Sequence, residues 1–328
     1  MAKSVFLCYI YMIYFCNGDD FFMIKKIWGS TAMIIATILW GVAFSAQSRG
    51  MDYLHPMLFT ALRSAVGVGA LCIVIMVIDF FREKRITFWG TAATSAEKKE
   101  LLTGGVWCGV VLAVASVLQQ YGVKYTSAGK TGFLTALYIV IVPVLGIFLR
   151  KKTTWLLWLA VALALSGAYL LCGGIDSVNK GEWFVIGCAF IYSLHILVID
   201  RYAPKCDSVR LSCVQFVVAA ILTFSGALVM QEPCSRELIS SSMPFWIFCG
   251  VGSSAAAFTL QIVAQKYLHP VTATLLMSLE SVFAVLGGWI FLHEILSPRE
   301  LLGCFVIFVS VIISQIPLPE KKRQTENG

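Results

Sequence analysis

Ionisable side chains within long apolar runs are the first candidates for chemistry in this chain. They are Arg63, Lys130, His195 and Glu280. A charge in the hydrocarbon core of a membrane is costly unless it is paired or hydrated, so such residues are functional candidates by default. Each must still be weighed against a purely structural role.

Glu280 is the strongest of these candidates, because it lies roughly a dozen residues from either end of its apolar run. A carboxyl group at that depth can contact a ligand, or take up and release a proton during a functional cycle. The alternative is a fixed hydrogen-bonded group that ties two helices together. His195 is the second proton-coupling candidate, since imidazole titrates near neutrality, although a buried histidine can also be a simple hydrogen-bonding residue.

Arg63 and Lys130 are candidate contacts for an anionic ligand. The guanidinium of Arg63 can bind a carboxylate through two parallel hydrogen bonds. Lys130 shares a helical face with Tyr138, so the two can line one side of a cavity. The alternatives are basic side chains that extend to the membrane interface and an interfacial tyrosine.

Two further residues complete the predicted ligand-binding set. Trp40 can supply an aromatic wall and Gln119 uncharged hydrogen bonds, with ordinary helix packing as the alternative.

Hinge and packing positions form a separate set. Pro143 can kink its helix. Glycines allow close helix approach or bending, and the predicted hinge and packing positions are Pro143, Gly129, Gly132, Gly287 and Gly288.

Motifs of metal sites and enzymes are missing from the sequence. It contains no CxxC pair, no HExxH, no GxSxG within an apolar run and no GxxxxGK[ST]. Most of the 11 cysteines fall in apolar runs, where a thiol packs as a small apolar group. We therefore expect no metal and no cofactor, and an intramembrane enzyme is the weakest alternative.

The elements that must position these residues are apolar stretches of bilayer length. A transmembrane helix needs about 20 mainly apolar residues to cross about 30 Å of hydrocarbon. Hydrophobic residues make up 59% of the chain and charged ones 13%, which excludes an ordinary soluble domain. The sequence predicts an all-α integral membrane protein with ten transmembrane helices at roughly 30–48, 57–79, 102–122, 127–149, 154–173, 183–200, 209–230, 244–264, 269–292 and 299–317.

Basic residues indicate the orientation. Lys and Arg concentrate in alternate loops, on the side shared by both basic chain ends, which predicts cytoplasmic termini in a plasma membrane, or the inner membrane of a Gram-negative cell. The net charge of +7 is accounted for by these loops, so no nucleic-acid partner is expected. The lipid bilayer is the expected environment.

The chain also repeats itself. A shift of 142 residues aligns 113–146 with 255–288 at 10 identities in 34 positions, including Gln119 with Gln261 and Tyr125 with Tyr267. Because the repeat holds five helices, an odd number, the second copy must be inverted. Inverted repeats are typical of secondary transporters with a midplane site.

The predicted boundaries follow from this repeat. Residues 27–174 form the first five-helix repeat, 183–317 the second and 318–328 a basic cytoplasmic tail. Residues 1–26 are an N-terminal extension. Its first 22 residues are predicted to come from an over-extended reading frame, because Met23-Ile-Lys-Lys is a more natural start; an interfacial flap is the alternative.

Four local motifs are spread over both halves: Leu39-Trp40-Gly41, Phe59-Thr-Ala-Leu-Arg63, Thr126-Ser-Ala-Gly-Lys-Thr-Gly-Phe and Leu279-Glu280-Ser-Val-Phe. In their order and spacing they resemble the EamA-type branch of the drug/metabolite transporter superfamily. Ser281 departs from the proline common in the family. The resemblance implies two inverted five-helix repeats and a secondary active transporter, an exporter of amino acids or other small metabolites.

The resemblance leaves several points open. Alternating access with proton coupling is one mechanism, and a uniporter or exchanger would need no titrating carboxylate. A non-catalytic membrane scaffold or sensor is the main alternative function. The substrate, the coupling ion and the oligomeric state are not predicted.

Overall fold

The computed structural model describes residues 18–82, 87–90, 92, 94–148, 154–171, 179–292 and 297–315. These residues form helices joined by short turns, and no strand occurs among them, as the predicted all-α class requires. In chain order the elements are α2 (Gly18–Gly50), α3 (Pro56–Arg82), α4 (Ser95–Tyr125), α5 (Ala128–Thr135), α6 (Tyr138–Phe148), α7 (Trp155–Leu171), α8 (Lys180–Tyr202), η1 (Ala203–Lys205), α9 (Ser208–Val229), α10 (Arg236–Ser241), α11 (Met243–Phe248), η2 (Cys249–Ala257), α12 (Phe258–Gln265), α13 (Pro270–Met277), α14 (Leu279–Leu292) and α15 (Pro298–Gln315).

Length and composition identify the membrane-crossing segments. Eight segments of the described chain are long and apolar enough to span a bilayer, and shorter apolar helices cover Trp155–Gly167 and Leu301–Ile313. A multi-pass helical membrane protein is thereby confirmed. The count of ten spans stays a prediction, because the two shorter helices fall below the length that a span needs.

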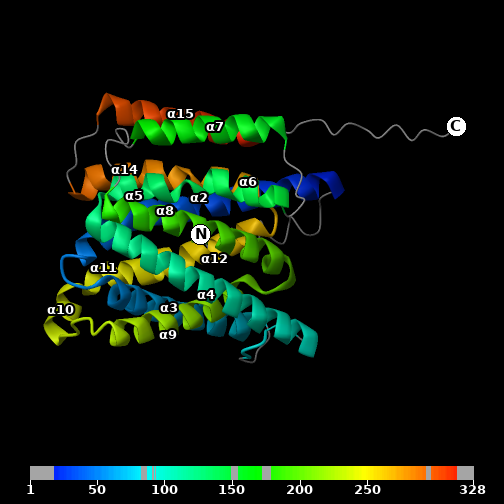
Figure 1. Cartoon of the computed structure of the whole chain (residues 1–328). Coiled ribbons are helices and arrows are strands. Elements are labelled where there is room, and N and C mark those ends of the chain that lie inside the picture. The colour runs from blue at the N-terminus through cyan, green and yellow to red at the C-terminus, as the bar shows by residue number, and fades with distance from the viewer. Residues whose placement is uncertain are drawn as a thin grey trace.

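Most helices run roughly parallel, and their connections gather at two ends of the bundle (Figure 1). Helix α7 packs along α15 as an outlying pair, and α3 packs along α9 at the opposite side of the bundle (Figure 1). Between these pairs, α4 packs on α8, and α2 packs on α14, η2 and α12. Helices distant in sequence therefore enclose the middle of the bundle.

The fourth and ninth predicted spans, 127–149 and 269–292, are each found as one segment of membrane length, Ala128–Phe148 and Pro270–Phe291, but the helix breaks within each. Helix α5 ends at Thr135 and α6 begins at Tyr138; α13 ends at Met277 and α14 begins at Leu279. At each break a backbone N–H donates to the carbonyl three residues earlier, as in a 3₁₀ helix. These bonds run from Ile139 N–H to Ala136 O (3.0 Å) and from Ser281 N–H to Ser278 O (3.1 Å). Neither break contains a proline or glycine, so the sequence carried no signal for them.

The first helix begins earlier than the sequence indicated. Helix α2 starts at Gly18, so residues 18–26 of the predicted extension continue that helix. Residues 1–17 and the predicted tail 318–328 lie outside the described residues.

Helices α2 and α14 approach unusually closely. A Cβ atom on Gly41 would lie 2.3 Å from Phe283 Cβ and 2.7 Å from the Phe283 carbonyl carbon. Only glycine leaves room for that backbone contact. The approach fixes α14 against α2 and thereby positions the side chains at the start of α14.

Candidate functional site

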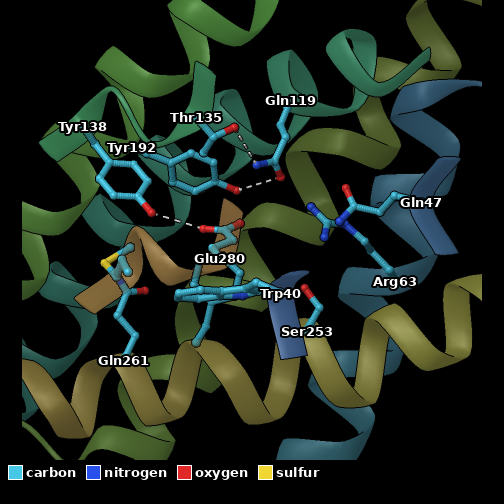
Figure 2. A pocket seen from close by; sticks show the side chains of 12 residues that line it. Trp40, Gln47, Arg63, Gln119, Thr135, Tyr138, Tyr192, Ser253, Gln261 and Glu280 are labelled. Atoms are coloured by element: carbon cyan, nitrogen blue, oxygen red, sulfur yellow. Dashed lines mark hydrogen bonds between the residues drawn. The ribbon is translucent and has the colours of Figure 1, made fainter. Parts of the chain in front are cut away.

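A polar cavity lies in the middle of the bundle (Figure 2). The space open to the centre of a water molecule is about 20 Å³, enough for about one water. A metabolite therefore needs the walls to move apart. The lining residues are Trp40, Gln47, Arg63, Gln119, Thr135, Tyr138, Tyr192, Ser253, Phe258, Gln261, Met277 and Glu280.

Glu280 and Tyr138 meet on one wall of the cavity. Both are buried, with exposed fractions of 6% and 1%. The Tyr138 hydroxyl donates a 3.2 Å hydrogen bond to Glu280 Oε2 (Figure 2). Because Tyr138 is the first residue of α6 and Glu280 the second of α14, the two helix breaks place this pair.

A chain of neutral hydrogen bonds orders a second wall. The Tyr192 hydroxyl donates to Gln119 Oε1 at 3.4 Å, and Gln119 Nε2 donates to Thr135 Oγ1 at 3.5 Å (Figure 2). Ser116 Oγ lies 3.4 Å from the same tyrosine hydroxyl. These contacts are long, so the amide and hydroxyl groups can exchange them for bonds to a ligand.

Arg63 enters the cavity beside Gln47, on the side away from Tyr138 (Figure 2). The residue is 3% exposed, and its Nε atom has no hydrogen-bond partner among the described residues. No carboxylate of the described chain forms an ion pair with it. A buried guanidinium without a counter-ion is strongly disfavoured unless it faces water or an anion, so Arg63 is a ready anion contact.

Other polar atoms around the cavity are also unsatisfied. Trp40 Nε1, Gln47 Oε1 and Gln261 Oε1 are buried without a hydrogen-bond partner in the described structure. Leaving such groups unpaired costs about 1–3 kcal/mol each. A ligand or water that pairs with them recovers this free energy, so the cavity is prepared for a polar occupant.

Three pairs of equivalent residues from the two sequence copies line the cavity. In each pair the two residues are 142 positions apart, and both line the cavity: Gln119 with Gln261, Thr135 with Met277, and Tyr138 with Glu280. The sequence repeat thus coincides with the walls of the site.

Lys130 does not line the cavity. Its ammonium group lies 3.0 Å from Glu182 Oε1, and its side chain is 40% exposed. Glu182 also accepts the backbone N–H of Asn179 and so caps α8. The lysine ties α5 to the start of α8 rather than facing the ligand space.

His195 lies behind the cavity wall. The ring is fully buried, its Nε2 is 3.2 Å from Gln215 Oε1, and it packs edge-on against Phe258 at 5.9 Å between ring centroids. Phe258 separates it from the ligand space. A contribution of His195 to proton movement stays a prediction.

The predicted glycines lie at helix contacts. A Cβ on Gly132 would be 3.1 Å from Ala284 Cβ, and one on Gly287 would be 3.1 Å from Ser45 Oγ. Gly129 has room for a Cβ, with Val285 Cγ2 at 3.7 Å, and Gly288 is buried. Pro143 lies inside α6, well beyond the break at 136–137, so its hinge role remains a prediction.

The lining residues outside the predicted ligand-binding set are Gln47, Thr135, Tyr192, Ser253, Phe258, Gln261 and Met277. Gln47 is seven residues from Trp40, two helical turns along one face, so the Trp40 face could have revealed it. Thr135 and Met277 could have been found from the 142-residue shift. Ser253 lies in the π-helical segment η2, whose wider turn the sequence does not signal.

Hydrogen bonds and an ion pair hold α3 and α9 together at both ends. At one end Glu232 accepts the backbone N–H groups of Met57 (3.2 Å) and Leu58 (2.7 Å) at the start of α3. At the other end the buried guanidinium of Arg210 pairs with Asp79, and it also donates to the Phe88 carbonyl at 3.1 Å. These contacts hold the two ends of α3 and α9 in place.

No group of three or more potential metal ligands occurs among the described residues. The fold and site thus define a multi-pass membrane protein with a small polar cavity in its bundle. The sequence model of the EamA-like transporter family matches residues 27–173 and 179–315. The chain belongs to this family.

Individual relatives agree with that assignment. The chain is similar to an uncharacterized transporter of Archaeoglobus fulgidus, at 23% identity over 88% of this chain and 86% of the relative. It is also similar to the threonine/homoserine exporter RhtA of Escherichia coli K12, at 24% identity over 81% and 84%. A solved crystal structure matches with a TM-score of 0.69 at 16% identity, covering 88% of this chain and 96% of the other, which supports the fold.

Proposed function

We propose that this protein is a secondary active transporter that exports a small zwitterionic metabolite, such as an amino acid, by alternating access. The observation that carries the proposal is the central cavity, which presents an arginine without an ion-pair partner at one side and a carboxyl group at the other. A site in the middle of the bundle that both sequence copies line is what alternating access requires. Both chain termini are cytoplasmic in this proposal.

The substrate chemistry follows from the two ends of the cavity. Arg63 binds a carboxylate through its planar fork of donors. Glu280 takes the ammonium group, while Trp40 and Tyr192 cover the carbon skeleton. An α-amino acid carries both charged groups on the same carbon atom. The similarity to RhtA, a protein named as an exporter of threonine and homoserine, supports this substrate class.

Two inverted five-helix halves form the proposed architecture. Gly29, near the start of α2, packs against Tyr267. Gly181, at the start of α8, packs against Tyr125. The two tyrosines are 142 residues apart, so each half packs its first helix on the equivalent tyrosine of the other half. The α3–α9 and α7–α15 pairs join equivalent helices in the same way.

Glu280 is the proposed coupling residue. In the cavity it can bind either a proton or the ammonium group of a substrate, but not both at once. Competition at one carboxyl group is sufficient to exchange protons for substrate. The Tyr138 hydroxyl can reorient its hydrogen bond as Glu280 changes its charge.

Counterflow into proteoliposomes tests the proposal. Vesicles holding purified protein and an unlabelled amino acid, threonine first, receive trace labelled amino acid outside, with and without a pH gradient. Saturable, protein-dependent counterflow is expected for a zwitterion. A panel should include the matched amine and the matched carboxylic acid, each lacking one charged group. Equal transport of all three would contradict a two-ended site, and no counterflow of any from folded protein would contradict a carrier.

A further inference from the structure

A second and larger cavity lies between α2, α11 and α14. It has a volume of about 370 Å³ and is separate from the central site. Its lining residues are Val42, Ser45, Ala46, Arg49, Pro244, Phe245, Phe248 and Phe291. This volume is in the range of specific ligand pockets, which run from about 300 to 1,000 Å³.

The second cavity opens away from the centre of the bundle. Its α2 residues, such as Val42 and Ala46, lie on a different face of that helix from Trp40 and Gln47, which line the central cavity. Phe248 and Phe291 are 38% and 56% exposed. In a membrane-spanning bundle such exposed apolar side chains face lipid.

Arg49 marks the mouth of this groove. It is the penultimate residue of α2, its side chain is 54% exposed, and Asp52 approaches it only at 4.0 Å. Val42 lies seven residues deeper, about 10 Å along the helix axis. The groove thus extends from a cation at the helix end into the depth of one leaflet.

Ser45 lies one turn below Arg49 on the lining of the groove. The residue is 3% exposed, and its hydroxyl oxygen is turned toward Gly287 of α14 rather than into the groove. The order from the membrane surface inward is therefore a cation and then an aromatic, apolar groove.

A glycerophospholipid has its groups in the same order: an anionic phosphate at the membrane surface and acyl chains below it. We propose that this groove is a binding site for a phospholipid of the leaflet that contains Arg49. Arg49 pairs with the phosphate, and one acyl chain packs between Phe245, Phe248 and Phe291.

Native mass spectrometry of the full chain in detergent tests this site, with added phosphatidylglycerol, phosphatidylcholine or inorganic phosphate. We expect retained phospholipid on the wild type and no effect of inorganic phosphate. Arg49→Gln should weaken retention roughly two- to fivefold, as an exposed ion pair does. Ala46→Trp should abolish it by filling the groove. Arg299→Gln, a matched change at the start of α15, should leave it unchanged.

Photocrosslinking keeps the test independent of how the variants fold. A phospholipid with a photoreactive acyl chain, bound to the wild type, should label peptides that contain 244–248 and 291. Labelling confined to other helices would overturn the proposal. Equal retention by folded Ala46→Trp would do the same, as would a dimer that is lost in Ala46→Trp without any bound lipid. None of these outcomes depends on transport.

Discussion

The Tyr138 hydroxyl donates a hydrogen bond to Glu280 across 3.2 Å, and the two residues occupy matching positions 142 residues apart. The contact joins α6 to α14, each at the first turn after a break in an apolar stretch. The two halves of the chain therefore meet through a phenol and a carboxyl group inside the cavity.

Replacing Glu280 by Gln should separate coupling from binding. The amide keeps an acceptor for Tyr138 but cannot take up a proton, so gradient-driven accumulation should fall to the background while counterflow continues with a raised KM, because the ammonium group loses its charged partner. Transport assays with and without a pH gradient measure both. Tyr138→Phe removes the hydrogen bond and retains the carboxyl group, so it should keep coupling. Accumulation by Glu280→Gln at the wild-type level would exclude Glu280 as the coupling residue.

Arg63 should determine affinity for the carboxylate of the substrate. A charge-assisted hydrogen bond contributes about 1.5–3 kcal/mol, so Arg63→Gln should raise KM roughly 10- to 100-fold. Arg63→Lys keeps the charge but loses the planar fork, and an intermediate KM is expected. The corresponding amine, which has no carboxylate, should bind the three proteins equally. A uniform loss for both compounds would indicate a structural role instead.

Gly41 and Gly69 form a matched pair for testing the α2–α14 contact. A Cβ on Gly41 would overlap Phe283, whereas one on Gly69 meets nothing within 4 Å. Gly41→Ala should lose about 1–3 kcal/mol through overpacking. Gly69→Ala should be neutral or gain up to about 1 kcal/mol of helix propensity. Thermal unfolding in one detergent compares them, and equal melting temperatures would contradict the close approach.

Asp79 should stabilise the end of the α3–α9 pair at which Arg210 is buried. Asp79→Asn leaves the guanidinium without its nearest counter-ion, and breaking a buried pair costs about 3–5 kcal/mol. A large drop in melting temperature is expected. Lys205→Gln, which breaks an exposed pair with Glu100, is the control and should change stability by less than about 1 kcal/mol. Similar effects of both changes would show that burial of Arg210 contributes little.

Hydropathy and the 142-residue shift made much of the fold predictable. The apolar runs predicted the helical membrane class, and Glu280, Arg63, Tyr138, Trp40 and Gln119 all line the cavity. A polar group in an apolar run is costly, so such residues are expected beside a polar cavity. That argument depends on composition and depth alone. The roles of these residues in binding and coupling stay predictions.

Contacts between side chains on different helices could not be predicted from composition and depth. Lys130 has the right depth and face for a cavity residue, but Glu182, 52 residues later, holds it at the helix end. The break at Ser278 was equally hidden, because it depends on packing around α13 and α14 rather than on a helix-breaking residue. Tertiary contacts decided both cases.

The unlike residues at positions 138 and 280 leave this contact with a single acid. Two glutamates so close together would repel or share one proton, and two tyrosines would provide no carboxylate. The difference between the two matching stretches of sequence therefore gives this contact one carboxyl group, whose charge can change without a second acid beside it at the contact.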